Sequence, residues 1–205
     1  LLVEDAKTVV KIDKVDVTSQ VELEGAHLQV IDQNGNVVEE WTSGDDKDQN
    51  GNIIPHEIEG LKTDEEYTLR ETVAPEGYTL ATDTFFTIGT DGTVTTTGSQ
   101  TTDGVLLVED WKTSVKISKV DITDMKEVEG AHLQVIDQNG SVVEEWDSGD
   151  DRDQNGSILP HAIEGLKTDE KYTLRETIAP EGYGLATDTY FTIGTDGKVT
   201  TSGIR

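Results

Sequence analysis

Apolar and polar residues alternate with a period of two along much of the chain. The alternation predicts strands with one buried face, at residues 9–17, 27–31, 37–41, 67–72, 85–88 and 106–110. Turn-forming sequences separate these strands, for example at residues 32–35 and 75–77. No window of about twelve residues shows the period of a helix, so the pattern predicts an all-β protein.

The sequence contains one domain twice. Residues 1–100 align with residues 106–205 without a gap, at an offset of 105 residues (106 minus 1), and 78 of these 100 positions are identical. About seven short strands in each copy predict a β-sandwich. We expect the first domain to cover residues 6–110 and the second to cover residues 111–205.

The repeat is out of frame with the ends of the sequence. The segment LLVED at residues 106–110 closes the first copy, occurs also at residues 1–5, and does not follow the second copy. We therefore expect residues 111–205 to lack a last strand of their own. Residues 1–5 are either the closing strand of a preceding repeat in a longer array or a donor strand for another molecule.

Charge and composition exclude several kinds of partner and several kinds of functional site. The formal net charge is −26, which excludes nucleic acid and anionic membrane surfaces as partners, since both would repel the chain. The absence of cysteine excludes disulfides, thiolate zinc sites and cysteine nucleophiles. No apolar run approaches the roughly 20 residues of a membrane helix, so no membrane insertion is expected in this segment.

Three predicted strands each place one ionisable residue on an apolar face, namely Lys14, Glu71 and Asp110. The second copy repeats two of them, as Lys119 and Glu176. The residues that share these faces are Val10 and Ile12, Tyr67 and Leu69, and Leu106 and Val108.

An isolated buried charge costs several kcal/mol, so such groups should be paired or neutral. A neutral amine beside a protonated carboxylic acid is a nucleophile facing an electrophile, and a second carboxyl could move the protons needed to form an amide and release water. The alternative is a buried salt-bridge cluster without covalent change. Strand parity alone favours the salt-bridge cluster.

The motifs around these residues resemble the collagen-adhesin B-type (CnaB-like or SpaA-like) domains of Gram-positive surface proteins and pilins. The matching motifs are KIDKVD, EGAHLQV, YTLRETVAPEGY and LLVEDWKT, and the resemblance covers both copies. It implies two tandem immunoglobulin-like (prealbumin-like) β-sandwich domains. It also implies a spontaneous isopeptide bond between Lys14 and Asp110, with Glu71 as the proton shuttle and Glu176 in the same role in the second copy.

We therefore expect a structural stalk, fibre or pilus module at the Gram-positive cell wall, outside the cell. The isopeptide forms once per domain, so the protein is not expected to be an enzyme. Its expected partners are neighbouring repeats or other copies of itself. Because the second copy lacks an acid in a last strand, Lys119 could bond Asp5 of a neighbouring chain, head to tail. The alternative function is an adhesin module that binds a host protein or glycan.

One acidic loop has the spacing of a calcium-binding loop. Counted from Asp46, it places Asp48, Asn50 and Glu57 at positions 3, 5 and 12, where EF-hand loops carry oxygen ligands. The flanking helices are missing, and the second copy has Ala162 at the last position. The alternative interpretation is a solvated hairpin turn. No cofactor is required, and calcium is the cation that this loop would suit.

Overall fold

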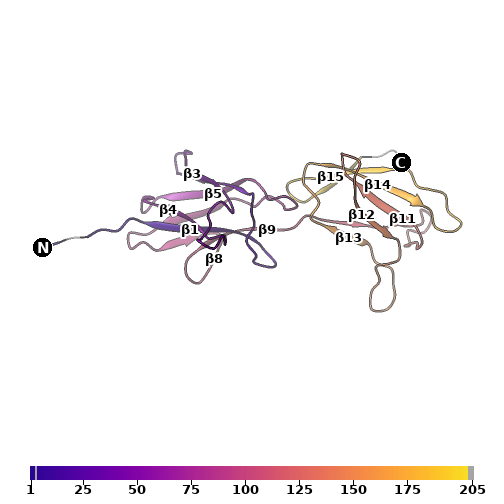
Figure 1. Ribbon diagram of the computed structural model, residues 1–205, viewed down its shortest axis with the longest axis horizontal. Coiled ribbons are helices and arrows are strands. Elements are labelled where there is room, and N and C mark those ends of the chain that lie inside the picture. The colour runs from indigo at the N-terminus through magenta and orange to yellow at the C-terminus, as the bar shows by residue number, and fades with distance from the viewer. Residues whose placement is uncertain (3, 203–205) are drawn as a thin grey trace. The chain divides into compact units, whose positions relative to one another are not determined.

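The computed structural model of the protein describes residues 1–2 and 4–202. Its described residues form strands, turns and loops without a helix, which confirms the all-β prediction. The chain divides into two compact units, Leu1–Trp111 and Lys112–Arg205 (Figure 1). No helix long and apolar enough to cross a membrane occurs in the described residues.

The first domain is a sandwich of two sheets. One sheet has the strand order β4-β1-β9-β8 and the other has the order β3-β2-β5-β6-β7. The strands are β1 (Val9–Asp16), β2 (His27–Ile31), β3 (Val37–Thr42), β4 (His56–Glu59), β5 (Glu66–Val73), β6 (Thr84–Ile88), β7 (Val94–Thr96), β8 (Ser99–Gln100) and β9 (Leu106–Asp110).

Alternate side chains of both sheets meet in the core. In β2, Leu28 and Val30 are almost completely buried, and burial of such a side chain contributes about 1.5–3 kcal/mol. The ring of Tyr67 from β5 stacks on Phe86 from β6, with centroids 5.4 Å apart. Because the period of the apolar residues matches the pleat, one face of each long strand fills the sandwich and the other remains polar.

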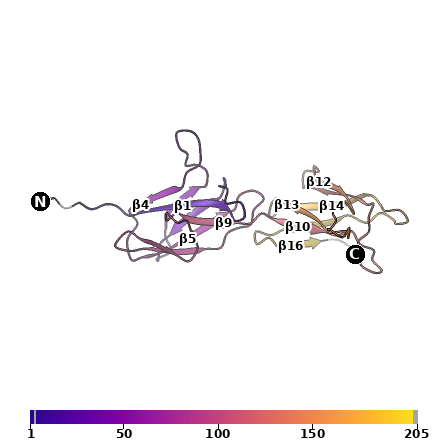
Figure 2. The same cartoon turned by 90° about the horizontal axis from the view of Figure 1, so that it is seen from below.

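The strands β1 and β9 open and close the first domain and lie side by side (Figure 2). They are parallel, with Ile12 opposite Leu106 and Asp16 opposite Asp110. The pairing places Lys14 opposite Val108. Asp110 lies two residues further along β9, on the same face of the sheet. This register brings an amine from the start of the domain to a carboxyl at its end.

The second domain repeats the larger sheet, in the order β12-β11-β14-β15-β16. The smaller sheet contains only β10 and β13 among the described residues. The strands are β10 (Ser114–Ile117), β11 (His132–Ile136), β12 (Val142–Asp147), β13 (His161–Glu164), β14 (Lys171–Ile178), β15 (Thr189–Ile193) and β16 (Val199–Ser202).

The difference in the smaller sheet predicts that the second domain is the less stable one. Calorimetry of the chain should show two unfolding transitions. Phe86→Ala should lower the upper transition and Phe191→Ala the lower one, each by a loss of about 3–5 kcal/mol, because both rings are buried in matching Tyr–Phe stacks. If Phe86→Ala shifts the lower transition instead, the order of stabilities is reversed.

Candidate functional site

Three strands bring Lys14, Glu71 and Asp110 together in the interior of the first domain. Lys14 comes from β1, Glu71 from β5 in the facing sheet, and Asp110 from the end of β9. Their relative exposures are 3%, 4% and 1%, so solvent does not screen the charges of these groups. The three residues that strand parity selected therefore share one buried site.

The amine of Lys14 lies between the two carboxyl groups. Its Nζ is 2.5 Å from Oδ1 of Asp110 and 3.5 Å from Oε1 of Glu71, and it donates a hydrogen bond of 3.3 Å to the carbonyl of Val108. The other carboxyl oxygen of Glu71 accepts a hydrogen bond of 2.6 Å from the backbone amide of Ala81. That amide fixes the Glu71 carboxyl beside the amine.

Burial shifts the proton affinity of both acids upward. It raises the pKa of the Glu71 carboxyl to about 7, although the neighbouring Lys14 amine and the Ala81 amide act in the opposite direction. Burial also raises the pKa of the Asp110 carboxyl, again against the lowering effect of Lys14. The site therefore favours protonated acids at a pH where solvent-exposed carboxyls are ionised.

The second domain contains two of the three groups of this site, Lys119 and Glu176. Nζ of Lys119 is 3.4 Å from Oε1 of Glu176, and the backbone amide of Ala186 donates a hydrogen bond of 2.5 Å to Oε2 of Glu176. The side chain of Lys119 is 17% exposed, against 1% for Lys14. Within the described part of this domain no third strand brings an acid to Lys119.

The predicted partner of Lys119, Asp5, lies near the start of the chain. Its side chain is exposed, and it precedes β1 without belonging to a strand. A bond between Asp5 and Lys119 of another molecule would join two chains.

In the structure the predicted calcium ligands have other partners. The carboxyl of Asp46 contacts Nδ1 of His56 at 2.7 Å, and Asp48 accepts hydrogen bonds from the backbone amides of residues 50 and 52. Glu57 lies in β4 and pairs with Lys11 of β1 at 3.2 Å. The described residues contain no group of three or more His, Cys, Asp or Glu side chains that could hold a metal.

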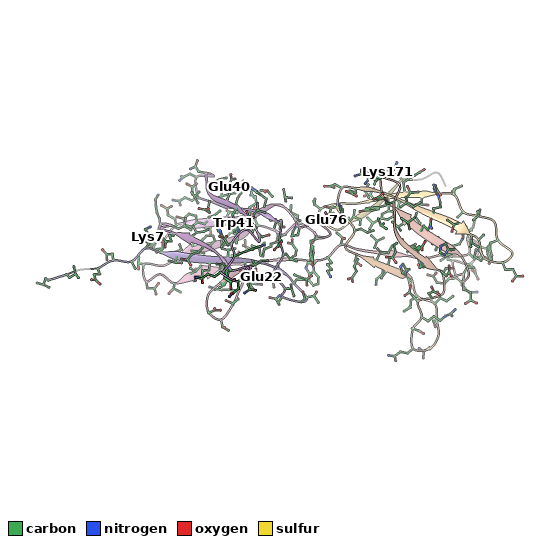
Figure 3. All side chains as sticks on the ribbon, viewed as in Figure 1. Lys7, Glu22, Glu40, Trp41, Glu76 and Lys171 are labelled. Carbon is green, nitrogen blue, oxygen red and sulfur yellow. The ribbon has the colours of Figure 1, made fainter. Side chains whose placement is uncertain are left out.

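The physical reason is the local fold of the loop. A calcium loop must curl so that its last acid returns to the first, whereas here β4 begins at His56 and carries Glu57 away along the sheet. The His56 ring stacks on Trp41, with centroids 4.2 Å apart. Figure 3 labels Trp41 in β3, where it packs against the core. Asp46 and Glu57, which the calcium interpretation assigned to a cation, contact His56 and Lys11 instead.

Sequence reasoning missed the backbone groups of the site. The amide of Ala81 and the carbonyl of Val108 both contact the buried cluster, and residue type gives no signal for either. The amide of Ala81 is reached through the turn that follows β5, where the motif APEGY precedes it in the sequence. This turn is the one sequence feature that could have indicated where the Glu71 carboxyl finds its donor.

The first domain is thus a β-sandwich whose two facing sheets bury a Lys–Glu–Asp cluster. The family model of the SpaA prealbumin-like fold domain matches residues 8–102 and again residues 113–204. The chain belongs to this family, and both tandem copies are members of it. None of the curated proteins compared with the chain matches it.

Several solved structures are similar to the chain. The C-terminal fragment of the pilus adhesin SpaC from Lactobacillus rhamnosus GG is 16% identical, with a TM-score of 0.47, and the match covers 96% of this chain and 86% of that one. A mutant of the shaft pilin SpaA from the same organism is 16% identical, with a TM-score of 0.34 and coverages of 98% and 100%.

The Bacillus anthracis TIE protein is 23% identical to the chain, with a TM-score of 0.44. The match covers 92% of this chain and 32% of that one. The chain therefore spans about a third of the length of this protein.

The buried acid predicts a pH dependence of stability in a chain that cannot form an amide. In Lys14→Met the Glu71 carboxyl should keep its proton to about pH 7 or above, because the amine that lowers its pKa is gone, whereas the unfolded carboxyl loses its proton near its ordinary pKa of 4.5. Stability should therefore fall by roughly 2–3 kcal/mol between pH 5 and pH 8.

Urea unfolding of Lys14→Met measures this dependence, and the double variant Lys14→Met/Glu71→Gln is its matched control. The double variant keeps the buried Asp110 but lacks the acid at position 71. The difference between the two slopes isolates Glu71. Equal slopes would show that the Glu71 carboxyl does not hold a proton in the folded state.

Proposed function

We propose that the chain is a structural module of a Gram-positive surface fibre, a stalk or pilus, in which a Lys14–Asp110 amide ties the first strand of the domain to the last. The observation that carries the proposal is the buried contact of 2.5 Å between Nζ of Lys14 and Oδ1 of Asp110, with Glu71 beside it. Membership of the SpaA prealbumin-like family supports the same role.

The bond would form by direct condensation. The neutral amine of Lys14 attacks Cγ of Asp110, whose carboxyl is protonated, and a carbon–nitrogen bond forms while the bond to the hydroxyl breaks. Glu71 takes a proton from the nitrogen and returns one to the departing hydroxyl, which leaves as water. A carboxyl with a pKa of about 7 can do both near neutral pH.

Burial supplies the driving force for this chemistry. A salt bridge at this depth must offset the desolvation of both ions, whereas a neutral amine and a neutral acid avoid that penalty. The amide product carries no charge at all. The reaction modifies the protein itself and occurs once in the first domain. Because no substrate is turned over, the module is a structural protein and not an enzyme.

The position of the bond suits a load-bearing fibre. Tension that enters before β1 and leaves after β9 pulls two parallel strands from opposite ends, so it loads their hydrogen bonds in shear. An amide between Lys14 and Asp110 carries this load through a covalent bond and shields residues 15–109. It does so without cysteine, which the chain lacks.

The charge of the chain is consistent with a place outside the cell in a crowded array. A net charge of −26 makes neighbouring copies repel each other except where their surfaces are complementary. Exposed sheet edges in a repetitive β protein otherwise favour aggregation. We therefore infer a cell-surface location and an assembly with other modules of the same kind.

The intact mass of the purified chain tests the amide. The wild type should be lighter than its sequence by one water, because only the first domain contains all three groups. Lys14→Arg and Glu71→Gln should have their full sequence masses. Lys11→Arg is the matched control, since Lys11 lies on the opposite, exposed face of β1 and pairs with Glu57, and it should still lose the water.

The outcomes separate the alternatives. A wild-type chain of full mass would establish the salt-bridge cluster and remove the amide. If Glu71→Gln still lost one water, the amide would form without Glu71 as its proton shuttle.

Single-molecule stretching tests the mechanical role. In the wild type the first domain should give almost no unfolding extension, because the amide spans all but its outermost residues. In Glu71→Gln the 95 residues from 15 to 109 become free to extend, which adds about 340 Å at about 3.6 Å per residue. The same extension in both chains would show that the bond does not carry the load.

A further inference from the structure

Two neighbouring residues of β5 hold the same loop from opposite faces of the sheet. The loop covers residues 74–83 and joins β5 to β6. Glu71 faces the core, and its Oε2 accepts a hydrogen bond of 2.6 Å from the backbone amide of Ala81. Arg70 faces outward and contacts the carboxyl of Asp83, where the loop ends. The core side therefore holds the loop by its backbone, and the outer side holds it by a side chain.

The contact between Arg70 and Asp83 has the geometry of a directional ion pair. Nε of Arg70 donates to Oδ1 and Oδ2 of Asp83 at 3.0 and 3.1 Å, and Nη2 donates to Oδ2 at 2.6 Å. A guanidinium that meets both carboxyl oxygens fixes the orientation of the carboxyl as well as its distance. The two side chains are 47% and 33% exposed, so the pair adds little to stability. Its main effect is on the position of the loop.

The ion pair extends the register of the sheet by one step. The backbone ladder between β5 and β6 ends with Leu69 opposite Thr84. The next pair in the same register is Arg70 and Asp83, which meet through their side chains. Beyond this pair the loop leaves the ladder, because the amide of Ala81 donates to a buried carboxyl and not to the backbone of β5. The ion pair thus lies at the point where the loop turns toward the core.

The second domain repeats both contacts. Nη2 of Arg175 is 2.7 Å from Oδ2 of Asp188, and the backbone amide of Ala186 donates to Oε2 of Glu176 at 2.5 Å. In both domains the aspartate follows its arginine by 13 residues, and the alanine follows its glutamate by 10 residues. The outer ion pair and the inner hydrogen bond therefore occur together in both units.

The hydrogen bond from Ala81 determines where the free oxygen of Glu71 points. With Oε2 held by the amide, Oε1 lies 3.5 Å from Nζ of Lys14. Proton transfer requires the acceptor oxygen to come within hydrogen-bond reach of the amine, and small displacements of a reacting group lower a rate strongly. The position of the loop should therefore affect how fast the amine loses its proton.

We propose that Arg70 is a positioning residue for the amide of the first domain. Through Asp83 it holds the loop whose Ala81 amide orients the carboxyl of Glu71. This inference rests on the condensation proposed above, and the bonds that form and break are those of that reaction. Arg70 itself neither donates nor accepts a proton in it.

The rate of water loss during refolding tests this role. Chain taken from inclusion bodies in urea should have its full sequence mass, and dilution then starts the reaction, which intact mass follows. Arg70→Ala should lose the water about five-fold more slowly than the wild type. Arg175→Ala is the matched control, because it removes the same ion pair from the other domain, and it should react at the wild-type rate. Intrinsic fluorescence in the same samples separates slow folding from slow condensation.

The pH profile of this rate distinguishes positioning from loss of stability. The pKa of the Glu71 carboxyl is about 7, and the Ala81 amide lowers it, as does the neighbouring Lys14, while the facing Asp110 acts in the opposite direction. The rate should rise with pH as Glu71 becomes a carboxylate that can accept the proton. In Arg70→Ala this rise should move to higher pH. A variant that only destabilised the domain would react more slowly at every pH without moving the rise.

A charge swap and hydrogen exchange complete the test. Arg70→Asp alone should react slowly, and the double variant Arg70→Asp/Asp83→Arg, which restores the pair in reverse, should recover the wild-type rate. The backbone amide of Ala81 should exchange faster in Arg70→Ala and at the wild-type rate in the swapped chain. A swapped chain as slow as the single variant would overturn the proposal.

The outcomes for the wild type separate this role from the condensation itself. A wild type that never loses the water overturns the amide and the role of Arg70 together. A wild type that loses the water at the same rate and with the same pH profile as Arg70→Ala overturns the role of Arg70 alone and leaves the amide in place.

Discussion

A lysine amine held between two carboxyl groups inside a β-sandwich is the interaction on which the first domain depends. Solvent does not reach Lys14, Glu71 or Asp110, so their charges can be balanced only by one another. Burial raises the pKa of both acids, that of the Glu71 carboxyl to about 7. The same burial that makes an ion pair expensive would favour the neutral amide that we propose.

The parallel register of β1 and β9 determines where this chemistry can act. A shift by one residue would turn Lys14 or Asp110 to the opposite face of the sheet and separate the amine from the acid. The larger sheet contributes Glu71 from across the core, and the turn after β5 contributes the Ala81 amide. The site therefore depends on both sheets of the sandwich, although only three side chains would take part in the proposed condensation.

Much of this arrangement could be predicted from the alternation of apolar and polar residues in the sequence. The strands β1, β2, β3, β5, β6 and β9 follow from period-two patterns, and parity alone selects the three buried ionisable residues. The strands β4, β7 and β8 were not predicted, because they are two to four residues long and largely polar. The spacing of oxygen-bearing residues predicted a calcium loop, but spacing does not specify the curl that would gather them.

The two domains form an internal comparison that separates the effect of sequence from that of strand pairing. Both carry the lysine and the glutamate, and the glutamate side chain is buried in both, yet the side chain of Lys119 is 17% exposed where that of Lys14 is 1% exposed. The motif around Lys119, KISKVD, differs from the KIDKVD around Lys14 at one position, and among the described residues β10 lacks the second neighbouring strand that β1 has. In the first domain the last strand, β9, therefore both covers the lysine and carries the acid that contacts it.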